Sequence, residues 1–137
     1  MKRIASIILA TIFCLMLIVP ASALENGVTP RYSNTCTTSS DFYISSDGKA
    51  DICLSYIGYQ GVTTGATITS KIQKKTLWWW NDVDGASWTD EATDFHYLVE
   101  HNFNLSKSGT YRLVYEFEIR GTGGAADVIS GNVEDKF

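Results

Sequence analysis

The chain of 137 residues is poor in histidine, the side chain that most often acts as an acid or base in enzymes. It contains only two histidines, His96 and His101, which are five residues apart in an alternating segment and therefore face opposite sides of a strand. A shared metal site or acid–base pair between them is excluded on that ground. The sequence also lacks a G-x-S-x-G elbow, a phosphate loop, a dinucleotide fingerprint and zinc-ligand spacing. We therefore expect a protein that is not an enzyme and that needs no cofactor.

Basic residues are also few. The chain has 11 Lys and Arg against 15 Asp and Glu, which gives a formal net charge of −4 at pH 7. Neutralising a phosphate backbone requires clustered positive charge, so we expect no nucleic-acid partner.

The sequence has one long apolar run, and it lies at the N-terminus. Met1-Lys2-Arg3 precedes the run from 4 to 19, and Pro20 with Ala21-Ser22-Ala23 follows it. This order is typical of a secretory signal peptide, residues 1–23, cleaved after Ala23. The run is shorter than the roughly 20 residues that span a bilayer, so we expect no stable membrane span after cleavage. The predicted product, residues 24–137, is secreted and carries a charge of about −6, since nine basic residues then face 15 acidic ones.

Two of the three cysteines, Cys36 and Cys53, remain in that product. An oxidising compartment favours a disulfide between them, which would close a loop of about 17 residues and contribute about 3 kcal/mol. The alternative is two free thiols, with Cys53 packed as a small apolar residue and Cys36 in a loose N-terminal arm, residues 24–38.

Period-two alternation dominates the rest of the chain and predicts an all-β protein. The expected strands cover 41–44, 50–59, 66–75, 77–83, 95–105, 111–119 and 127–133. Asp47-Gly48 and Asp84-Gly85 are the strongest turn signals, each expected to reverse the chain. Six or seven short strands at this spacing favour a small antiparallel immunoglobulin-like β-sandwich as a single domain, with a small closed barrel as the alternative. Tyr111 stands where such sandwiches place a tyrosine that hydrogen-bonds to the preceding corner.

Several of these segments together carry a resemblance to a known family. They are Ser46-Asp47-Gly48-Lys49-Ala50, Lys71-Ile72-Gln73-Lys74-Lys75, a tryptophan a few residues on, and Gly109-Thr110-Tyr111-Arg112-Leu113 before a Gly-rich turn. Their order is similar to that in a family of small secreted proteins of Gram-positive bacteria with an immunoglobulin-like β-sandwich and no assigned function. The resemblance implies fold and location, and it implies no active site.

The most unusual feature of the sequence is the triplet Trp78-Trp79-Trp80, followed by Trp88. Successive strand residues face opposite sides, so either Trp79 lies in the core with Trp78 and Trp80 on the surface, or the reverse. Exposed neighbouring indoles can stack on sugars or lie in a membrane interface. We expect Trp78, Trp80 and Trp88 to be the ligand-binding residues, with packing alone as the alternative.

The acidic segment 81–85 faintly resembles a calcium loop. It would offer Asp82 and Asp84 as metal ligands, but Trp80 stands at the position of the first ligand and no helices flank the segment. A plain turn with solvated carboxylates is the alternative, and it is favoured.

These observations favour a non-catalytic binding module for an extracellular carbohydrate or cell-wall surface. Two alternatives remain: a secreted effector that acts on neighbouring cells or membranes, and a structural or adhesive subunit that associates with itself through its edge strands.

Overall fold

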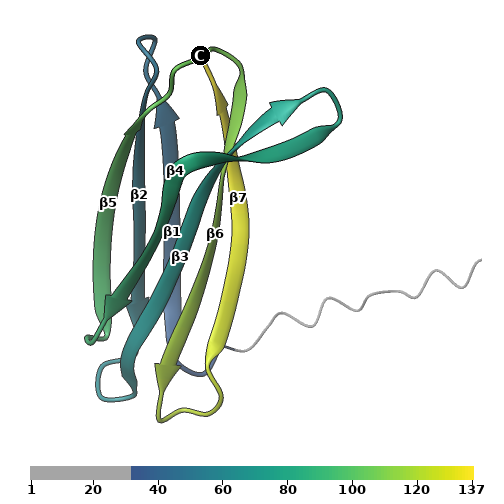
Figure 1. Cartoon of the computed structure of the whole chain (residues 1–137). Helices are drawn as coiled ribbons and strands as arrows, with labels where there is room; N and C mark the ends of the chain where they lie inside the picture. The colour runs from purple at the N-terminus through teal and green to yellow at the C-terminus, as the bar shows by residue number, and fades with distance from the viewer. Residues whose placement is uncertain (1–31) are drawn as a thin grey trace, which may run out of the picture. The chain divides into compact units, whose positions relative to one another are not determined.

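In the computed structural model, which describes residues 32–137, the chain is all-β. Seven strands lie in two antiparallel sheets (Figure 1). They are β1 (Thr35–Ile44), β2 (Lys49–Gly58), β3 (Thr63–Thr76), β4 (Trp79–Ala92), β5 (His96–Asn104), β6 (Thr110–Gly121) and β7 (Asp127–Lys136). The predicted β-sandwich is therefore confirmed, and the alternative of a closed barrel is wrong because the two sheets are separate. The predicted signal peptide lies outside the described residues, and within them no helix is long and apolar enough to cross a membrane.

Alternation of apolar and polar residues places the core between the sheets. The inward positions of β2, namely Ala50, Ile52, Leu54 and Tyr56, are each no more than 2% exposed. Inward residues of β6 meet them from the other sheet, where Leu113, Phe117 and Ile119 are fully buried. Removal of this apolar surface from water is the main driving force that holds the two layers together.

The strand order is β1-β2-β5 in one sheet and β4-β3-β6-β7 in the other. An immunoglobulin constant-type sandwich puts its fourth strand beside the fifth, whereas here the fourth strand pairs with the third. The hydroxyl of Tyr111 donates a hydrogen bond to the carbonyl of Lys107, four residues back. This confirms the predicted tyrosine corner before β6.

The start of β1 is fixed by polar side chains, not left loose. Asp127, at the start of β7, accepts hydrogen bonds from the backbone N–H groups of Ser33 and Asn34 and from the Thr35 hydroxyl, at 3.1, 2.7 and 2.9 Å. The Asn34 side chain is itself buried, and its amide donates to the Ala125 carbonyl at 2.8 Å. The expected loose arm, residues 24–38, is therefore wrong for its described part.

The predicted disulfide is absent, and Cys36 and Cys53 are both free. In the β1–β2 ladder Cys53 lies opposite Asp41, whereas Thr37, beside Cys36, lies opposite Ile57. The two cysteines are thus several residues apart along the strands, roughly 15 Å at the usual rise per residue. A disulfide requires Cα atoms within about 7 Å, so the pairing register prevents this bridge.

The β3–β4 hairpin is longer than predicted and reverses at a different place. Thr76 pairs with Trp79, so Leu77 and Trp78 form a two-residue turn. The far end of the hairpin projects from the sandwich (Figure 1). The turn expected at Asp84-Gly85 is wrong. Gly85 lies within β4 at φ 77°, in a bulge where residues 83–86 face the single residue Ile72. Such a bulge bends its strand, which accounts for the change of direction.

Candidate functional site

The hairpin tip, defined as Leu77, Trp78 and Trp79, is the most exposed apolar cluster of the described residues. The exposed fractions are 84% for Leu77, 90% for Trp78 and 73% for Trp79. Neither arrangement expected from strand alternation is observed, because Trp78 belongs to the turn and the alternation is interrupted there. The possibility that the tryptophans serve only as core packing is wrong for Trp78 and Trp79.

The backbone of the tip is strained. Leu77 has φ 54°, and no other non-glycine residue of the described chain has a positive φ. Two-residue hairpin turns normally use Gly, Asn or Asp at such positions, because a Cβ makes the left-handed region unfavourable. A leucine and a tryptophan in this turn do not help the hairpin to form. Local strain of this kind is typical of functional positions.

Trp80 is half-buried on the opposite face of the hairpin from Trp79. The Arg112 guanidinium lies over its ring at 4.4 Å from the ring centroid, and the Lys75 ammonium lies at 5.5 Å. Cations that close to an indole are bound by its π-face. Trp80, one of the three predicted ligand residues, therefore packs against the protein's own cations.

Asp82 stands at the centre of a polar network on this same face. It accepts hydrogen bonds from the Gln73 amide at 2.6 Å and from the Lys71 ammonium at 2.9 Å, and Gln73 in turn accepts from Arg112 at 2.8 Å. The hydrogen bond from Gln73, followed by the one from Lys71, lowers the pKa of Asp82 below its ordinary value. The network ties β4, β3 and β6 together across the base of the hairpin.

The predicted metal ligands Asp82 and Asp84 do not form a metal site in the described part of the chain. No group of three or more His, Cys, Asp or Glu side chains there is arranged to hold a metal ion. Asp82 is held by Gln73 and Lys71, and Asp84 is exposed in the bulge. The metal site considered for Asp82 and Asp84 from the sequence is therefore wrong.

The underside of the hairpin, opposite the Trp80 face, borders a cleft of about 400 Å³. Lys74 and Thr76 of β3 line it together with Asn81 and Asp84 of β4. The end of β5 and the segment after it form the other side, through Phe103, Asn104, Ser106 and Lys107. Because Trp79 pairs with Thr76, and Asn81 with Lys74, the Trp79 ring is on the same face as the cleft. This hairpin cleft combines amide, hydroxyl and charged groups with an exposed indole at its edge.

Trp88, the third predicted ligand residue, lies away from the tip, at the seam between β4 and β5. Its ring stacks on His101 with centroids 4.8 Å apart, and it meets Phe103 edge-on at 6.3 Å. The His101 Nε2 and an Asp90 carboxylate oxygen are 2.8 Å apart. Trp88 therefore closes the side of the sandwich and does not join Trp78.

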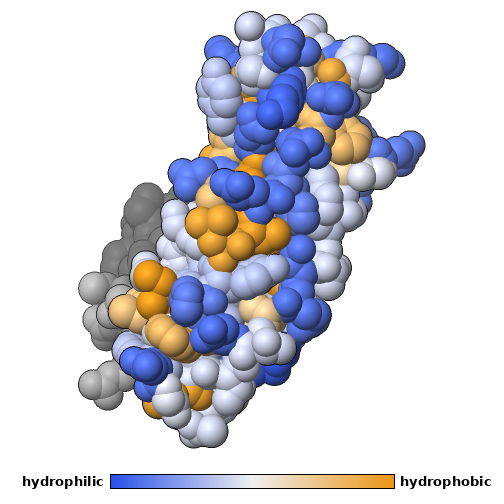
Figure 2. Space-filling model, turned by 90° about the vertical axis from the view of Figure 1, so that its left-hand side faces the viewer, coloured by the Kyte–Doolittle hydropathy of each residue, from blue (hydrophilic) through white to orange (hydrophobic). Residues whose placement is uncertain are grey.

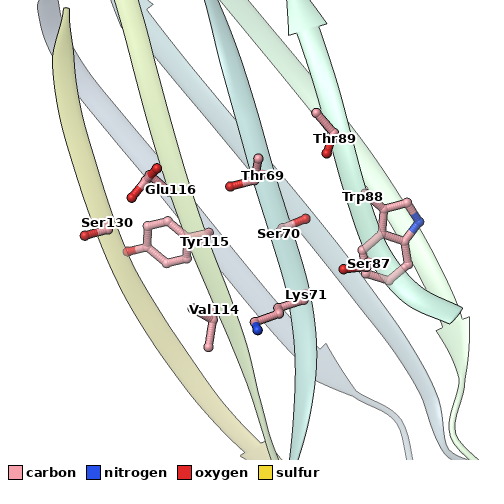
Figure 3. Close-up of a pocket in the computed structure, with 10 residues that line it drawn as sticks. All are labelled: Thr69, Ser70, Lys71, Ser87, Trp88, Thr89, Val114, Tyr115, Glu116 and Ser130. Carbon is pink, nitrogen blue, oxygen red and sulfur yellow. The ribbon is translucent and has the colours of Figure 1, made fainter. Parts of the chain in front are cut away.

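A second hollow, of about 310 Å³, lies over the outer face of the four-stranded sheet (Figure 3). Short polar side chains from β3, β4 and β7 surround it, including Thr69, Thr89 and Ser130. In Figure 3 the Trp88 ring points away from the hollow and the Tyr115 ring lies toward β7. Because neither of these two rings is turned into the hollow, the hairpin cleft, with Trp79 at its edge, is the better candidate site.

The sequence identified Trp78, left a surface position for Trp79 open without choosing it as a ligand residue, and gave no indication of Leu77, Asn81 or Asn104. The signal that was available was the two-residue spacing between Lys75-Thr76 and Trp79-Trp80, which permits a hairpin even though no turn-forming residue stands in it. Asn104 carried no signal, because only the bend of β4 brings it opposite the hairpin.

Comparisons of the chain with protein-family models, with curated proteins and with solved structures found no match.

Proposed function

We propose that this protein is a secreted, non-catalytic module that binds extracellular carbohydrate, such as a cell-wall polymer, through the β3–β4 hairpin. The observation that carries the proposal is the position of Trp78 and Trp79, 90% and 73% exposed, on a hairpin that borders a polar cleft. Secretion is supported by the signal-like residues 1–23, and the resemblance to small secreted proteins of Gram-positive bacteria points to the same location.

The chemistry of the hairpin cleft suits a sugar. A sugar ring presents an apolar face to a flat aromatic ring and hydroxyl groups at its edge, and Trp79 offers such a ring beside the cleft. Asn81 and Asn104 each bring an amide that both donates and accepts hydrogen bonds, which matches hydroxyl groups. Lys74 and Lys107 bring two positive charges to the lining, and Asp82 and Asp84 bring two negative ones, so the cleft as a whole selects neither an anionic nor a cationic polymer.

The contact residues of this proposal differ from those expected from the sequence. Trp78 is retained, Trp79 replaces Trp80, and Trp88 is left out because its ring stacks on His101. A ligand that enters the cleft meets the underside of the hairpin, whereas Trp80 lies on the opposite face under Arg112.

Co-sedimentation with purified Gram-positive cell walls and with insoluble polysaccharides tests the proposal. We expect Trp79→Ala and Asn81→Ala each to lower the bound fraction at least about tenfold, with stability changed by no more than about 0.5 kcal/mol, since both side chains are exposed. The matched control is Tyr43→Ala, which removes a 63% exposed aromatic ring from the other sheet and should leave binding unchanged. If the wild type sediments with no polymer, or if both hairpin variants bind like the wild type, the proposal is wrong.

A further inference from the structure

An apolar pocket of about 440 Å³ lies on the outer face of the three-stranded sheet. Ile57 of β2 and Leu98 of β5 line it, and they are 50% and 59% exposed. Phe95 and Tyr97 complete its apolar wall, and His96 stands beside them. On the face drawn in Figure 2, apolar side chains form separate patches among hydrophilic ones. An apolar pocket on an outward sheet face indicates a contact with another molecule.

The same chain carries an apolar projection that such a pocket can receive, the hairpin tip. Leu77 and Trp78 form the turn at its end. Neither residue lines the hairpin cleft. The tip extends from the four-stranded sheet, whereas the pocket faces outward from the other sheet. Because the sandwich separates them, a tip and a pocket meet only when they belong to different copies. We propose that the hairpin tip of one copy docks into the Ile57–Leu98 pocket of a second copy.

Charge supports this choice of occupant. Three cations lie along the hairpin, Lys74 and Lys75 on its β3 arm and Arg112 over Trp80 at its base, and none forms an ion pair with a carboxylate in the described chain. The pocket has carboxylates on both sides. Asp94 precedes it and lies 3.7 Å from His96, and Glu100 is two residues beyond Leu98 on the same strand face. Docking therefore brings a basic surface against an acidic one, which favours correct orientation.

The contact is heterologous, because a tip and a pocket are different surfaces. A joined pair still has one free tip, on one copy, and one free pocket, on the other, so further copies add head to tail into chains or rings. The contact area is small, so association is weak and appears only at high concentration or on a surface that gathers copies. This contact and carbohydrate binding share Trp78, but the Ile57–Leu98 pocket belongs only to the contact between copies, and Asn81 in the cleft belongs only to carbohydrate binding.

Analytical ultracentrifugation of the purified protein tests the proposal, with a reducing agent present so that the exposed Cys36 cannot form a disulfide between copies. We expect the weight-average mass to rise at least twofold between about 10 µM and about 1 mM, the range in which weak contacts are populated. Leu98→Asp removes the pocket, and Leu77→Asp with Trp78→Ser removes the tip. Each variant should stay monomeric across that range. Val128→Asp, at a 56% exposed apolar residue of β7, is the matched control and should associate like the wild type.

Mixing the two variants provides the decisive measurement. The tip variant retains its pocket and the Leu98→Asp variant retains its tip, so an equimolar mixture should form a dimer that grows no further. A mixture that stays monomeric, a wild type that is monomeric at every concentration, or assemblies of Leu98→Asp alone would each overturn the proposal. Leu98→Asp should still sediment with carbohydrate, and Asn81→Ala should still associate. Failure of one function is thereby distinguished from failure of the other.

Discussion

Replacing Leu77 by glycine should stabilise the fold while it removes a tip residue. Leu77 is held at φ 54°, a left-handed conformation that is unfavourable by about 1–2 kcal/mol for a residue with a Cβ. Its side chain is 84% exposed, so its loss forfeits only a few tenths of the roughly 1.5–3 kcal/mol of a fully buried leucine. Glycine adds about 0.5–1 kcal/mol of chain entropy to the unfolded state. The expected result is a net gain of about 0.5 kcal/mol.

Urea unfolding followed by tryptophan fluorescence measures this change, and Leu77→Asn is the companion variant. Asparagine tolerates the left-handed region without the entropy of glycine, so it should stabilise the fold by about 1 kcal/mol. Leu77→Ala keeps the Cβ and the strain, and its stability should stay within a few tenths of a kcal/mol of the wild type. A loss of more than about 0.5 kcal/mol in Leu77→Gly would refute the reasoning, because it would mean that the leucine side chain contributes to folding.

Two further predictions concern the sandwich itself. Tyr111→Phe removes the hydrogen bond to the Lys107 carbonyl but leaves the buried ring, so unfolding should become easier by about 1 kcal/mol, whereas Tyr43→Phe on the surface should change nothing measurable. For the thiols, we expect Ellman's reagent at pH 8 to modify the exposed Cys36 quickly and Cys53 more slowly. Burial raises the pKa of Cys53 above its ordinary value, and the negative charges of Glu100 and Asp41 raise it further. The thiol of Cys53 ionises at a lower pH in the unfolded chain than in the folded chain, so the free energy of unfolding should fall as the pH rises above about 9. In the labelling experiment, equal rates for the two cysteines would contradict the burial of Cys53.

The elements predicted well from the sequence are those whose pattern is local. In β2 and β6, alternation over eight or more residues determines which side chains face the core, and it needs no knowledge of the partner strands. The Asp47-Gly48 turn also forms as expected, with Gly48 at φ 85°. Tyr111 was predictable because its hydrogen-bond partner is only four residues away.

The errors came from features that depend on strand pairing. Asp84-Gly85 supplies the same positive φ as Asp47-Gly48, but β4 stays paired with β3 on both sides of it, so the glycine forms a bulge and not a turn. The disulfide failed for a similar reason, since the β1–β2 register sets the distance between Cys36 and Cys53. Neither register is visible in a short stretch of sequence.

The three tryptophans of the hairpin have two roles: Trp78 and Trp79 are available for contact, and Trp80 supports the base of the hairpin. Trp78 and Trp79 face solvent, whereas Trp80 packs under Arg112 and joins the network through Gln73 to Asp82. A projecting hairpin without such support would lose conformational entropy each time it bound a partner. Because Trp80 and Asp82 fix the base of the hairpin beforehand, that loss is reduced. The strain at Leu77 is then tolerable, since the ladder on both sides of the turn determines the backbone there.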